Sequence, residues 1–206
     1  MRTLVIDSAS EACSVALFDD EELLAGTWEH LGRGHAERLV PMIAALPGRG
    51  QAARIAVSLG PGSFTGVRVG LAAARGLALA WRAEVYGFAT LALVAAMARE
   101  DSGAQPVGVA VTGGHGEWFV AGFGAEGEVT RHLASLPPAL AVAETAENIV
   151  AGSQAEALVA ARGSGRALPL FPDARRFASL GDAGLTTSLA PLYGRGPDAK
   201  PASAGL

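Results

Sequence analysis

The chain has 206 residues, of which half are apolar and 17% are charged, and its formal net charge is −4. This length is enough for one large domain or two small ones, and the apolar fraction supports a sizeable buried core. Lysine and arginine form no cluster, which argues against autonomous, charge-driven binding to RNA or DNA. Cys13 is the single cysteine, which excludes an intrachain disulfide and a cysteine-based zinc site.

The beginning of the chain and its hydropathy favour a cytoplasmic protein. Asp7 interrupts the first apolar residues too early for a signal peptide. No apolar stretch without charges is long enough to span a bilayer. We therefore expect a cytoplasmic chain with no membrane partner.

The first hundred residues alternate between predicted strands and helices. Short apolar or β-branched runs predict strands at residues 3–6, 13–18, 23–28, 55–59 and 85–87. Apolar residues at helical spacing predict helices at residues 35–45, 63–82 and 90–99. Ser63 and Thr90 are the expected N-caps of the last two helices, and Pro41 is expected to kink or delay the first.

A similar order returns after the polar residues 101–103. Strands are predicted at residues 107–111, 117–123, 128–132 and 148–151. Helices are predicted at residues 139–147, 155–161 and 174–180, followed by an extended segment at 191–197 and a disordered tail. Two rounds of three strands followed by alternating helices and strands predict an α/β protein with mixed sheets covered by helices. We place the boundary between two subdomains so that they comprise residues 1–102 and 103–206.

The helix that begins at Ser63 is unusually rich in small and apolar residues. Small residues recur every four positions and form one row along it: Gly66, Gly70, Ala74 and Ala78. A glycine inside a helix costs about 1 kcal/mol against alanine, which suggests that another backbone approaches this row. Three interpretations stay open: a docking surface for a partner or a second copy, a helix buried wholly in its own domain, and a phosphate site at the helix start.

The glycine-rich turn before this helix and the end of the first strand are candidate ligand positions. Asp7 closes the first strand beside Ser8 and Ser10, where α/β folds often place ligand groups, although a turn cap explains it equally well. The turn carries Gly60, Gly62 and Ser63, but it fits neither the P-loop nor the dinucleotide template. The histidines have no metal-ligand spacing, so no metal site is expected.

Several segments resemble the TsaB (YeaZ) family of bacteria. The resemblance lies in residues 4–17, 34–41 and most specifically 60–70, where the match to the family signature is almost residue for residue. It also includes Thr90-Leu91 and the late segment Pro191-Leu192-Tyr193-Gly194-Arg195. It is strong to about residue 100 and weak afterwards, and residues 111–114 depart from the family pattern.

The resemblance implies an actin-like, sugar-kinase-like (ribonuclease H-like) fold with two similar subdomains. It implies a role in making N6-threonylcarbamoyladenosine (t6A) at position 37 of tRNA. In that role the chain would be a non-catalytic subunit, without a cofactor, that docks on and activates a TsaD-type catalytic homologue. A TsaE-type ATPase would join them, tRNA would be bound only through the complex, and the free chain could form a homodimer.

Docking is expected to use the helices near residues 35–46 and 63–82. The expected contact residues are His35, Leu39, Met42, Phe64, Gly66, Val67, Arg68, Gly70, Leu71, Ala74, Arg75 and Ala78. In the same interpretation, the vestiges of a phosphate loop would be Asp7, Gly60, Gly62 and Ser63. The alternative function is an autonomous nucleotide-binding, kinase-like enzyme or a peptidase-like hydrolase of the same superfamily.

Overall fold

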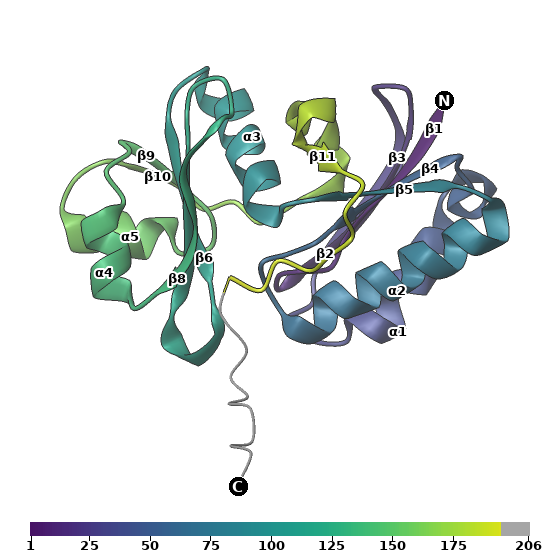
Figure 1. Ribbon diagram of the computed structural model, residues 1–206, viewed down its shortest axis with the longest axis horizontal. Helices are drawn as coiled ribbons and strands as arrows, with labels where there is room; N and C mark the ends of the chain where they lie inside the picture. Colours follow the sequence, from purple (N-terminus) through teal and green to yellow (C-terminus); the bar gives the residue numbers. More distant parts are fainter. Residues whose placement is uncertain (195–206) are drawn as a thin grey trace, which may run out of the picture.

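Two β-sheets stand side by side, each with helices packed against it (Figure 1). The structure is a computed structural model that describes residues 1–194. The elements of the first half are β1 (Arg2–Asp7), β2 (Ala12–Asp19), β3 (Glu22–His30), α1 (His35–Ala45), η1 (Pro47–Gly50), β4 (Arg54–Ser58), α2 (Phe64–Trp81), β5 (Glu84–Phe88) and α3 (Thr90–Ser102). The second half begins with β6 (Val107–Thr112), η2 (Gly114–Gly116), β7 (Trp118–Phe123), β8 (Val129–Leu136), α4 (Pro138–Glu144), β9 (Ile149–Ala151), α5 (Ala155–Arg162) and β10 (Arg166–Leu168). Three short elements follow: η3 (Ala174–Leu180), η4 (Asp182–Gly184) and β11 (Leu185–Thr186).

Apart from the additional edge strand β11 of the first sheet, the two sheets share one topology. The first has the strand order β11-β5-β4-β1-β2-β3, and the second has the order β10-β9-β6-β7-β8. In both sheets the first three strands form an antiparallel meander, and the next two strands pair in parallel on its open side. The predicted α/β fold class, with its repeated order of elements and mixed sheets, is therefore confirmed.

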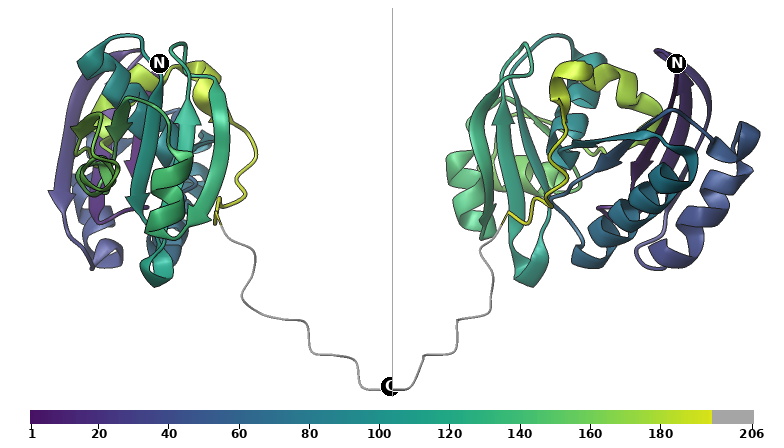
Figure 2. Two further views of the ribbon diagram at one scale, coloured as in Figure 1. Left: turned by 90° about the vertical axis from the view of Figure 1, so that its left-hand side faces the viewer. Right: turned by 45° about the vertical axis from the view of Figure 1, so that its right-hand side comes forward.

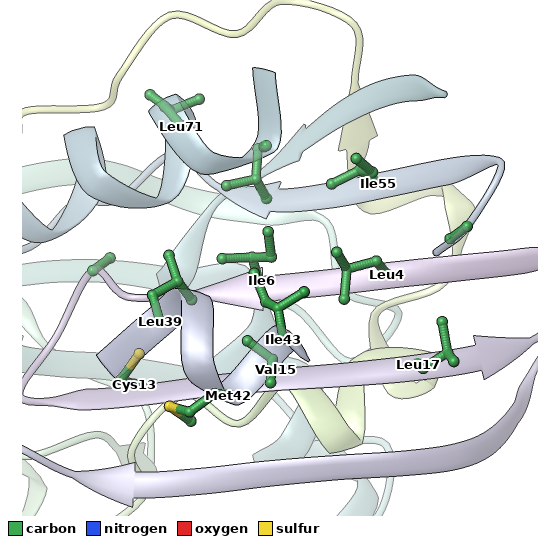
Figure 3. Packing of buried hydrophobic residues seen from close by; sticks show 14 of the residues in the cluster. Leu4, Ile6, Cys13, Val15, Leu17, Leu39, Met42, Ile43, Ile55 and Leu71 are labelled. Atoms are coloured by element: carbon green, nitrogen blue, oxygen red, sulfur yellow. The ribbon is translucent and has the colours of Figure 1, made fainter. Parts of the chain in front are cut away.

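The sheets and helices form alternating layers, visible in the two views of Figure 2. Helices α1 and α2 cover one face of the first sheet, where apolar side chains from both layers interdigitate, among them Leu4, Ile6, Val15, Leu39, Ile43 and Leu71 (Figure 3). Helix α3 and the segment η3 fill the space between the two sheets. Helices α4 and α5 cover the far face of the second sheet. The central strands are buried on both faces, which explains their continuous apolar runs.

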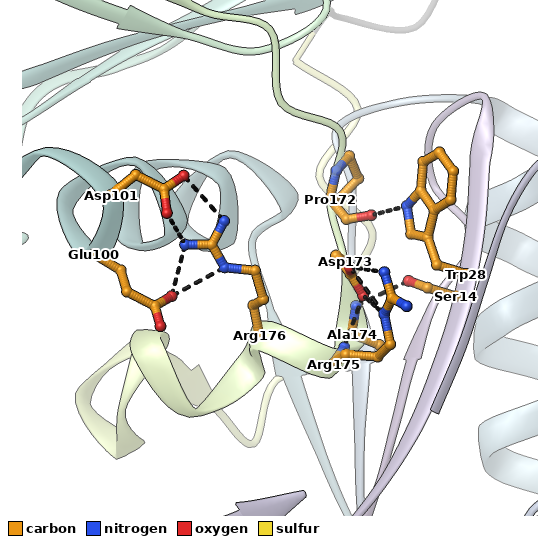
Figure 4. A network of polar contacts seen from close by, with 9 residues as sticks. All are labelled: Ser14, Trp28, Glu100, Asp101, Pro172, Asp173, Ala174, Arg175 and Arg176. Atoms are coloured by element: carbon orange, nitrogen blue, oxygen red, sulfur yellow. Dashed lines mark hydrogen bonds and ion pairs between the residues drawn. The ribbon is translucent and has the colours of Figure 1, made fainter. Parts of the chain in front are cut away.

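The segment after β10 returns to the first sheet, as Figure 4 shows in close-up. The indole nitrogen of Trp28 donates to the Pro172 carbonyl at 3.2 Å, and the Ala174 amide donates to Ser14 Oγ at 2.9 Å. Arg176 donates to Glu100 and to Asp101 at the end of α3. Finally β11 pairs antiparallel with β5. A division after residue 102 therefore separates the two sheets but assigns the residues of η3 and β11 to the wrong half.

Local predictions were mostly right near α1 and α2. Helix α1 begins at His35 although Pro41 lies inside it; Pro41 is exposed, so water can reach the carbonyl that loses its helical partner. Ser63 caps α2, because its Oγ accepts from the Gly66 amide at 3.2 Å. Thr90 is not the N-cap of α3; Ala89 is, and Thr90 Oγ1 instead bonds Ser58 Oγ at 2.6 Å. Of the extended segment predicted at 191–197, residues 195–197 lie outside the described part.

Candidate functional site

The inner face of the α1–α2 layer includes most of the residues that were predicted to contact a partner. Helices α1 and α2 contact each other and lie together on the first sheet (Figure 1). The side chains or backbone of eight predicted contact residues are buried in that layer: His35, Leu39, Met42, Gly66, Val67, Gly70, Leu71 and Ala74. They pack on the chain's own sheet, which leaves them little surface for the predicted intermolecular contact. Ala78 is half-buried.

The small-residue row of α2 accommodates the end of β1 rather than a partner. A Cβ at Gly66 would collide with the Ser8 carbonyl oxygen, and a Cβ at Gly70 would lie 2.7 Å from Ser8 Oγ. The hydroxyl of Ser8 donates to the Gly66 carbonyl at 2.9 Å. The approaching backbone that the glycines imply therefore belongs to the same chain. For this face of the helix, burial in its own domain is the correct interpretation.

The opposite face of the layer is exposed and unusually apolar. Leu79 is 86% exposed, Val40 is 61% exposed and Phe64 is 55% exposed. Small residues lie around them on the two helices: Ala36, Ala44, Ala72, Gly76 and Ala80. We call these eight residues, together with the exposed Arg68 and Arg75, the α1–α2 outer face. Sequence reasoning found three of its members, Phe64, Arg68 and Arg75, and missed Val40 and Leu79. The helical spacing of Leu79 from Ala72, seven residues earlier, could have indicated it.

A C-terminal segment, residues 187–194, runs along one edge of this surface, and we call it the strap. Arg75 donates to the Leu189 carbonyl at 3.4 Å, and the rings of Tyr193 and Phe64 are 5.6 Å apart. The Leu192 amide donates to the Leu59 carbonyl at 2.7 Å. Because the strap also reaches Phe119 of β7 beside Gly194, it joins the edge of α2 to the second sheet.

The glycine-rich turn is fastened to the loop that follows β1. The Ser63 amide donates to the Ala9 carbonyl at 2.6 Å, and a Cβ at Gly62 would collide with that same carbonyl. Gly60 has a φ of +90° and its amide donates to Ser58 Oγ at 3.3 Å. These contacts give the turn a structural role, because several of its backbone polar groups form hydrogen bonds within the chain.

Asp7 is fully buried at the end of β1. Its Oδ1 accepts from the Ala9 amide at 3.0 Å, which is the turn-cap geometry, and its Oδ2 has no partner among the described residues. Burial raises the pKa of this carboxyl to about 7, with a smaller contribution from the nearby Asp173, while the Ala9 amide opposes the shift. Asp7 therefore serves the fold at this position and does not line the cleft described next.

A cleft of about 230 Å³ lies between the two halves of the chain. Gly62, Ser63 and Glu11 line it from the first half, and Thr112, Gly113 and Ser153 line it from the second. Residues 111–114, which depart from the family pattern, thus border this cleft. Its lining residues include the carboxylate of Glu11 but no lysine or arginine, which makes the cleft a poor host for a polyphosphate. Within residues 1–194, no three His, Cys, Asp or Glu side chains cluster as metal ligands would. In the same range, no helix is long and apolar enough to cross a bilayer.

Comparisons with known proteins agree on one family. Residues 29–182 match the family model described as TsaD: tRNA N6-adenosine threonylcarbamoyltransferase. The protein named tRNA threonylcarbamoyladenosine biosynthesis protein TsaB from Escherichia coli (strain K12) is 40% identical over 124 residues, which are 58% of this chain and 53% of that protein. The protein of the same name from Bacillus subtilis (strain 168) is 30% identical over 108 residues, covering 50% and 47% of the two chains. The matched region thus spans about half the length of these curated relatives.

Solved structures extend the likeness over most of the chain. YeaZ from Pseudomonas aeruginosa is 30% identical, with a TM-score of 0.72 over 87% of this chain and 89% of that one. The ethanolamine utilization protein EutJ from Carboxydothermus hydrogenoformans has a TM-score of 0.53 at 12% identity, covering 88% and 90%, and it supports the actin-like fold alone. From the matched model and the YeaZ likeness together, the chain belongs to the tRNA N6-adenosine threonylcarbamoyltransferase family and, within it, to the TsaB (YeaZ) proteins.

Proposed function

We propose that this chain is a non-catalytic subunit in the synthesis of N6-threonylcarbamoyladenosine at position 37 of tRNA. It docks on a TsaD-type catalytic subunit and activates it, and a TsaE-type ATPase joins the complex in the cytoplasm. The t6A role is supported by the names of its relatives. Docking on a TsaD-type homologue is supported by the match to the TsaD family model. The contact residues are those of the α1–α2 outer face, and the buried residues behind it hold the two helices in place.

The observation that carries this proposal is the exposure of Leu79, Val40 and Phe64 on adjacent helices. A leucine that is 86% exposed beside alanine and glycine leaves an apolar surface open to water. Removing such a surface from water is favourable by about 25 cal/mol for each Å², before the entropic and desolvation costs of association are subtracted. Contiguous exposed apolar surface rimmed by polar residues is typical of protein interfaces, and the arginines of α2 supply such a rim.

A non-catalytic role is supported by the way the glycine-rich turn is used. In a nucleotide-binding protein such a turn offers its amides to phosphate. Here the Ser63 amide donates to Ala9, the Gly60 amide donates to Ser58, and the Gly66 amide donates to Ser63. The alternative, an autonomous kinase-like enzyme, requires tight binding of ATP and magnesium to the isolated chain. Isothermal titration calorimetry that detects such binding, followed by hydrolysis, would favour the enzyme.

The test is binding of a TsaD-type subunit from the same cells, measured by sedimentation velocity. Leu79→Glu places a charge at the centre of the outer face, and we expect it to weaken the complex at least tenfold. Leu140→Glu on α4 is the matched control, because Leu140 is 52% exposed on the far side of the second sheet. Both variants are expected to keep the melting temperature of the wild type, since exposed substitutions rarely change stability by more than about 0.5 kcal/mol.

The level of t6A in cells also distinguishes the Leu79→Glu variant from the control. In bacteria depleted of their own TsaB-type protein, the wild type and Leu140→Glu are expected to restore t6A in hydrolysed tRNA, measured by mass spectrometry. Leu79→Glu is expected to restore much less. A wild-type chain that neither binds the TsaD-type subunit nor restores t6A would disprove the proposed function.

A further inference from the structure

A second cavity, of about 340 Å³, lies at the end of the first sheet where β1 and β4 begin, next to the end of the chain marked N in Figure 1. Its volume is within the range of small-molecule sites, about 300–1,000 Å³. The cleft, in contrast, lies where the same strands end. We call the second cavity the η3 hollow, because η3 and the turn after it face the strands across it; its main lining residues are Thr3, Phe18, Arg54, Phe177, Ala178 and Asp182.

The pairing of the strands places three different side chains in one row on the floor of the η3 hollow. Thr3 of β1 is opposite Phe18 of β2 and also opposite Arg54 of β4. Residues that are opposite each other in a sheet point to the same face. An aromatic ring, a hydroxyl and a guanidinium therefore lie side by side on the face that η3 covers. Phe177 of η3 packs on Phe18, with ring centres 6.2 Å apart, so one part of the hollow is apolar.

The polar groups of this row have few partners within the chain. Thr3 is only 6% exposed and lines the hollow, and its hydroxyl forms no hydrogen bond within residues 1–194. The Arg54 guanidinium lies 4.5 Å from the centre of the Tyr86 ring, and its only side-chain hydrogen bond in the same range is the one to Asp182. Its Nε is buried and has no acceptor there. Buried polar groups are nearly always hydrogen-bonded, so these groups indicate a place for a ligand with acceptor oxygens.

The charges around the η3 hollow exclude simple ions of either sign. Arg54 is a cation on the floor, and a ligand that is only a cation would be repelled by it. The mouth carries the carboxylates of Asp20, Glu21 and Asp182. The amine of Met1 pairs with Asp20, whereas Glu21 forms no ion pair among the described residues. A ligand that is only an anion would be repelled by this mouth, so a ligand with both charges fits best.

We infer that the η3 hollow binds a free α-amino acid with an apolar or aromatic side chain. Its carboxylate binds the Arg54 guanidinium and accepts from the Thr3 hydroxyl, and its ammonium binds Asp182. Its side chain lies against Phe18 and Phe177.

The spacing of the two protein charges suits this class of ligand. Arg54 Nη2 and Asp182 Oδ1 are 2.9 Å apart, and the two charged groups of an α-amino acid are attached to one carbon atom. The Asp182 side chain is 83% exposed, so it can turn toward the ligand and leave the guanidinium to the carboxylate. One internal ion pair is then replaced by two charge-assisted contacts with the ligand. The hollow shares no residue with the α1–α2 outer face, so the inference does not depend on the proposed function.

The experiment is a titration of the ¹⁵N-labelled full-length chain, followed by ¹H–¹⁵N NMR spectra. The probes are L-phenylalanine, L-leucine, L-phenylalaninamide, which lacks the carboxylate, and N-acetyl-L-phenylalanine, which lacks the ammonium. We expect L-phenylalanine to shift the amides of Thr3, Arg54 and Gly181 with a dissociation constant of about 1 mM or below. The two probes with a single charge are expected to bind about tenfold more weakly or worse.

Asp182→Asn tests the assignment of the two charges. It removes the partner of the ammonium but leaves Arg54 for the carboxylate, so the preference for L-phenylalanine over the N-acetyl probe should fall from about tenfold to about threefold or less. Glu156→Gln neutralises an exposed carboxylate on α5 and is the matched control, with the preference of the wild type.

Three results would overturn the inference. The first is the absence of shifts at Thr3 and Arg54 with both amino acids at about 20 mM, including the case in which shifts appear only at cleft residues such as Gly62. The second is binding of either single-charge probe as tight as that of L-phenylalanine. The third is an Asp182→Asn variant that keeps the full preference of the wild type.

Discussion

The ionisation of Asp7 is strongly altered by its position in the fold. An aspartate normally titrates near pH 3.9. Burial at the end of β1 raises the pKa of Asp7 to about 7, because the charged form loses its hydration and gains one amide donor in return. Between these two pH values the folded chain binds a proton that the unfolded chain releases. The contribution of Asp7 to stability is therefore full below about pH 4 and is lost as the pH rises to about 7.

Asp7→Asn is expected to remove this dependence, because an amide can still accept the Ala9 hydrogen bond and does not ionise. The free energy of unfolding of the wild type should fall by about 2–3 kcal/mol more than that of the variant between pH 5 and pH 8. Urea unfolding at the two pH values measures this difference. Parallel pH profiles for the two proteins would show that Asp7 titrates normally.

At the scale of elements, helix α2 has two faces that use small residues differently. Gly70 lies inside, where a Cβ would be 2.7 Å from Ser8 Oγ and 3.5 Å from the Val57 side chain. Gly76 lies outside, where a Cβ would meet no atom within 4 Å. The two glycines therefore have different roles. Gly70 allows α2 to pack closely on the end of β1, whereas Gly76 leaves the outer face without a protruding side chain at that position.

The same substitution at these two glycines should have opposite effects on stability. Gly70→Ala is expected to lower the free energy of unfolding by about 1–3 kcal/mol through overpacking. Gly76→Ala is expected to raise it by about 0.5–1 kcal/mol, since alanine favours an exposed helix interior. Thermal and urea unfolding measure both. Equal changes in the two variants would mean that the faces of α2 are not as described.

Sequence patterns predicted the elements better than they predicted the orientation of α2. Apolar spacing and the capping residue Ser63 were local signals, so α1 and α2 were located well. The row of Gly66 and Gly70 indicated a close backbone contact, but nothing in the pattern says which chain provides it. The partner of the row is Ser8, more than fifty residues away, and that approach exists only in the folded sheet. For the same reason, the pairing of β11 with β5 had no local signal.

At the scale of the whole molecule, separate segments tie the two sheets together. Helix α3 and η3 fill the space between the sheets, and the strap crosses from the edge of α2 to β7. Arg176 of η3 joins this middle layer, because it donates to the carboxylates of Glu100 and Asp101 (Figure 4). It also donates to the Met97 carbonyl of α3. The outer face is therefore part of a structure in which both sheets are held together by several contacts.

Arg176→Gln tests how much the contacts between η3 and the end of α3 contribute to stability. It leaves the two carboxylates at the end of α3 without their cation, and we expect a loss of about 1–3 kcal/mol in the free energy of unfolding. Arg38→Gln breaks the exposed pair with Glu29 and is expected to cost about 0–1 kcal/mol. Urea unfolding of the two variants compares them. A loss for Arg176→Gln no greater than that for Arg38→Gln would contradict the bracing role.

The proposed contact between the outer face of α1 and α2 and the TsaD-type subunit is tested most directly by cross-linking from residue 79. Cys13 is buried, and burial raises the pKa of its thiol to about 12, so Leu79→Cys introduces the one reactive thiol among the described residues. After labelling with a photoreactive maleimide, this variant is expected to cross-link to the TsaD-type subunit, whereas Leu140→Cys is not. Cross-linking from residue 140 but not from residue 79 would place the interface elsewhere and contradict the account.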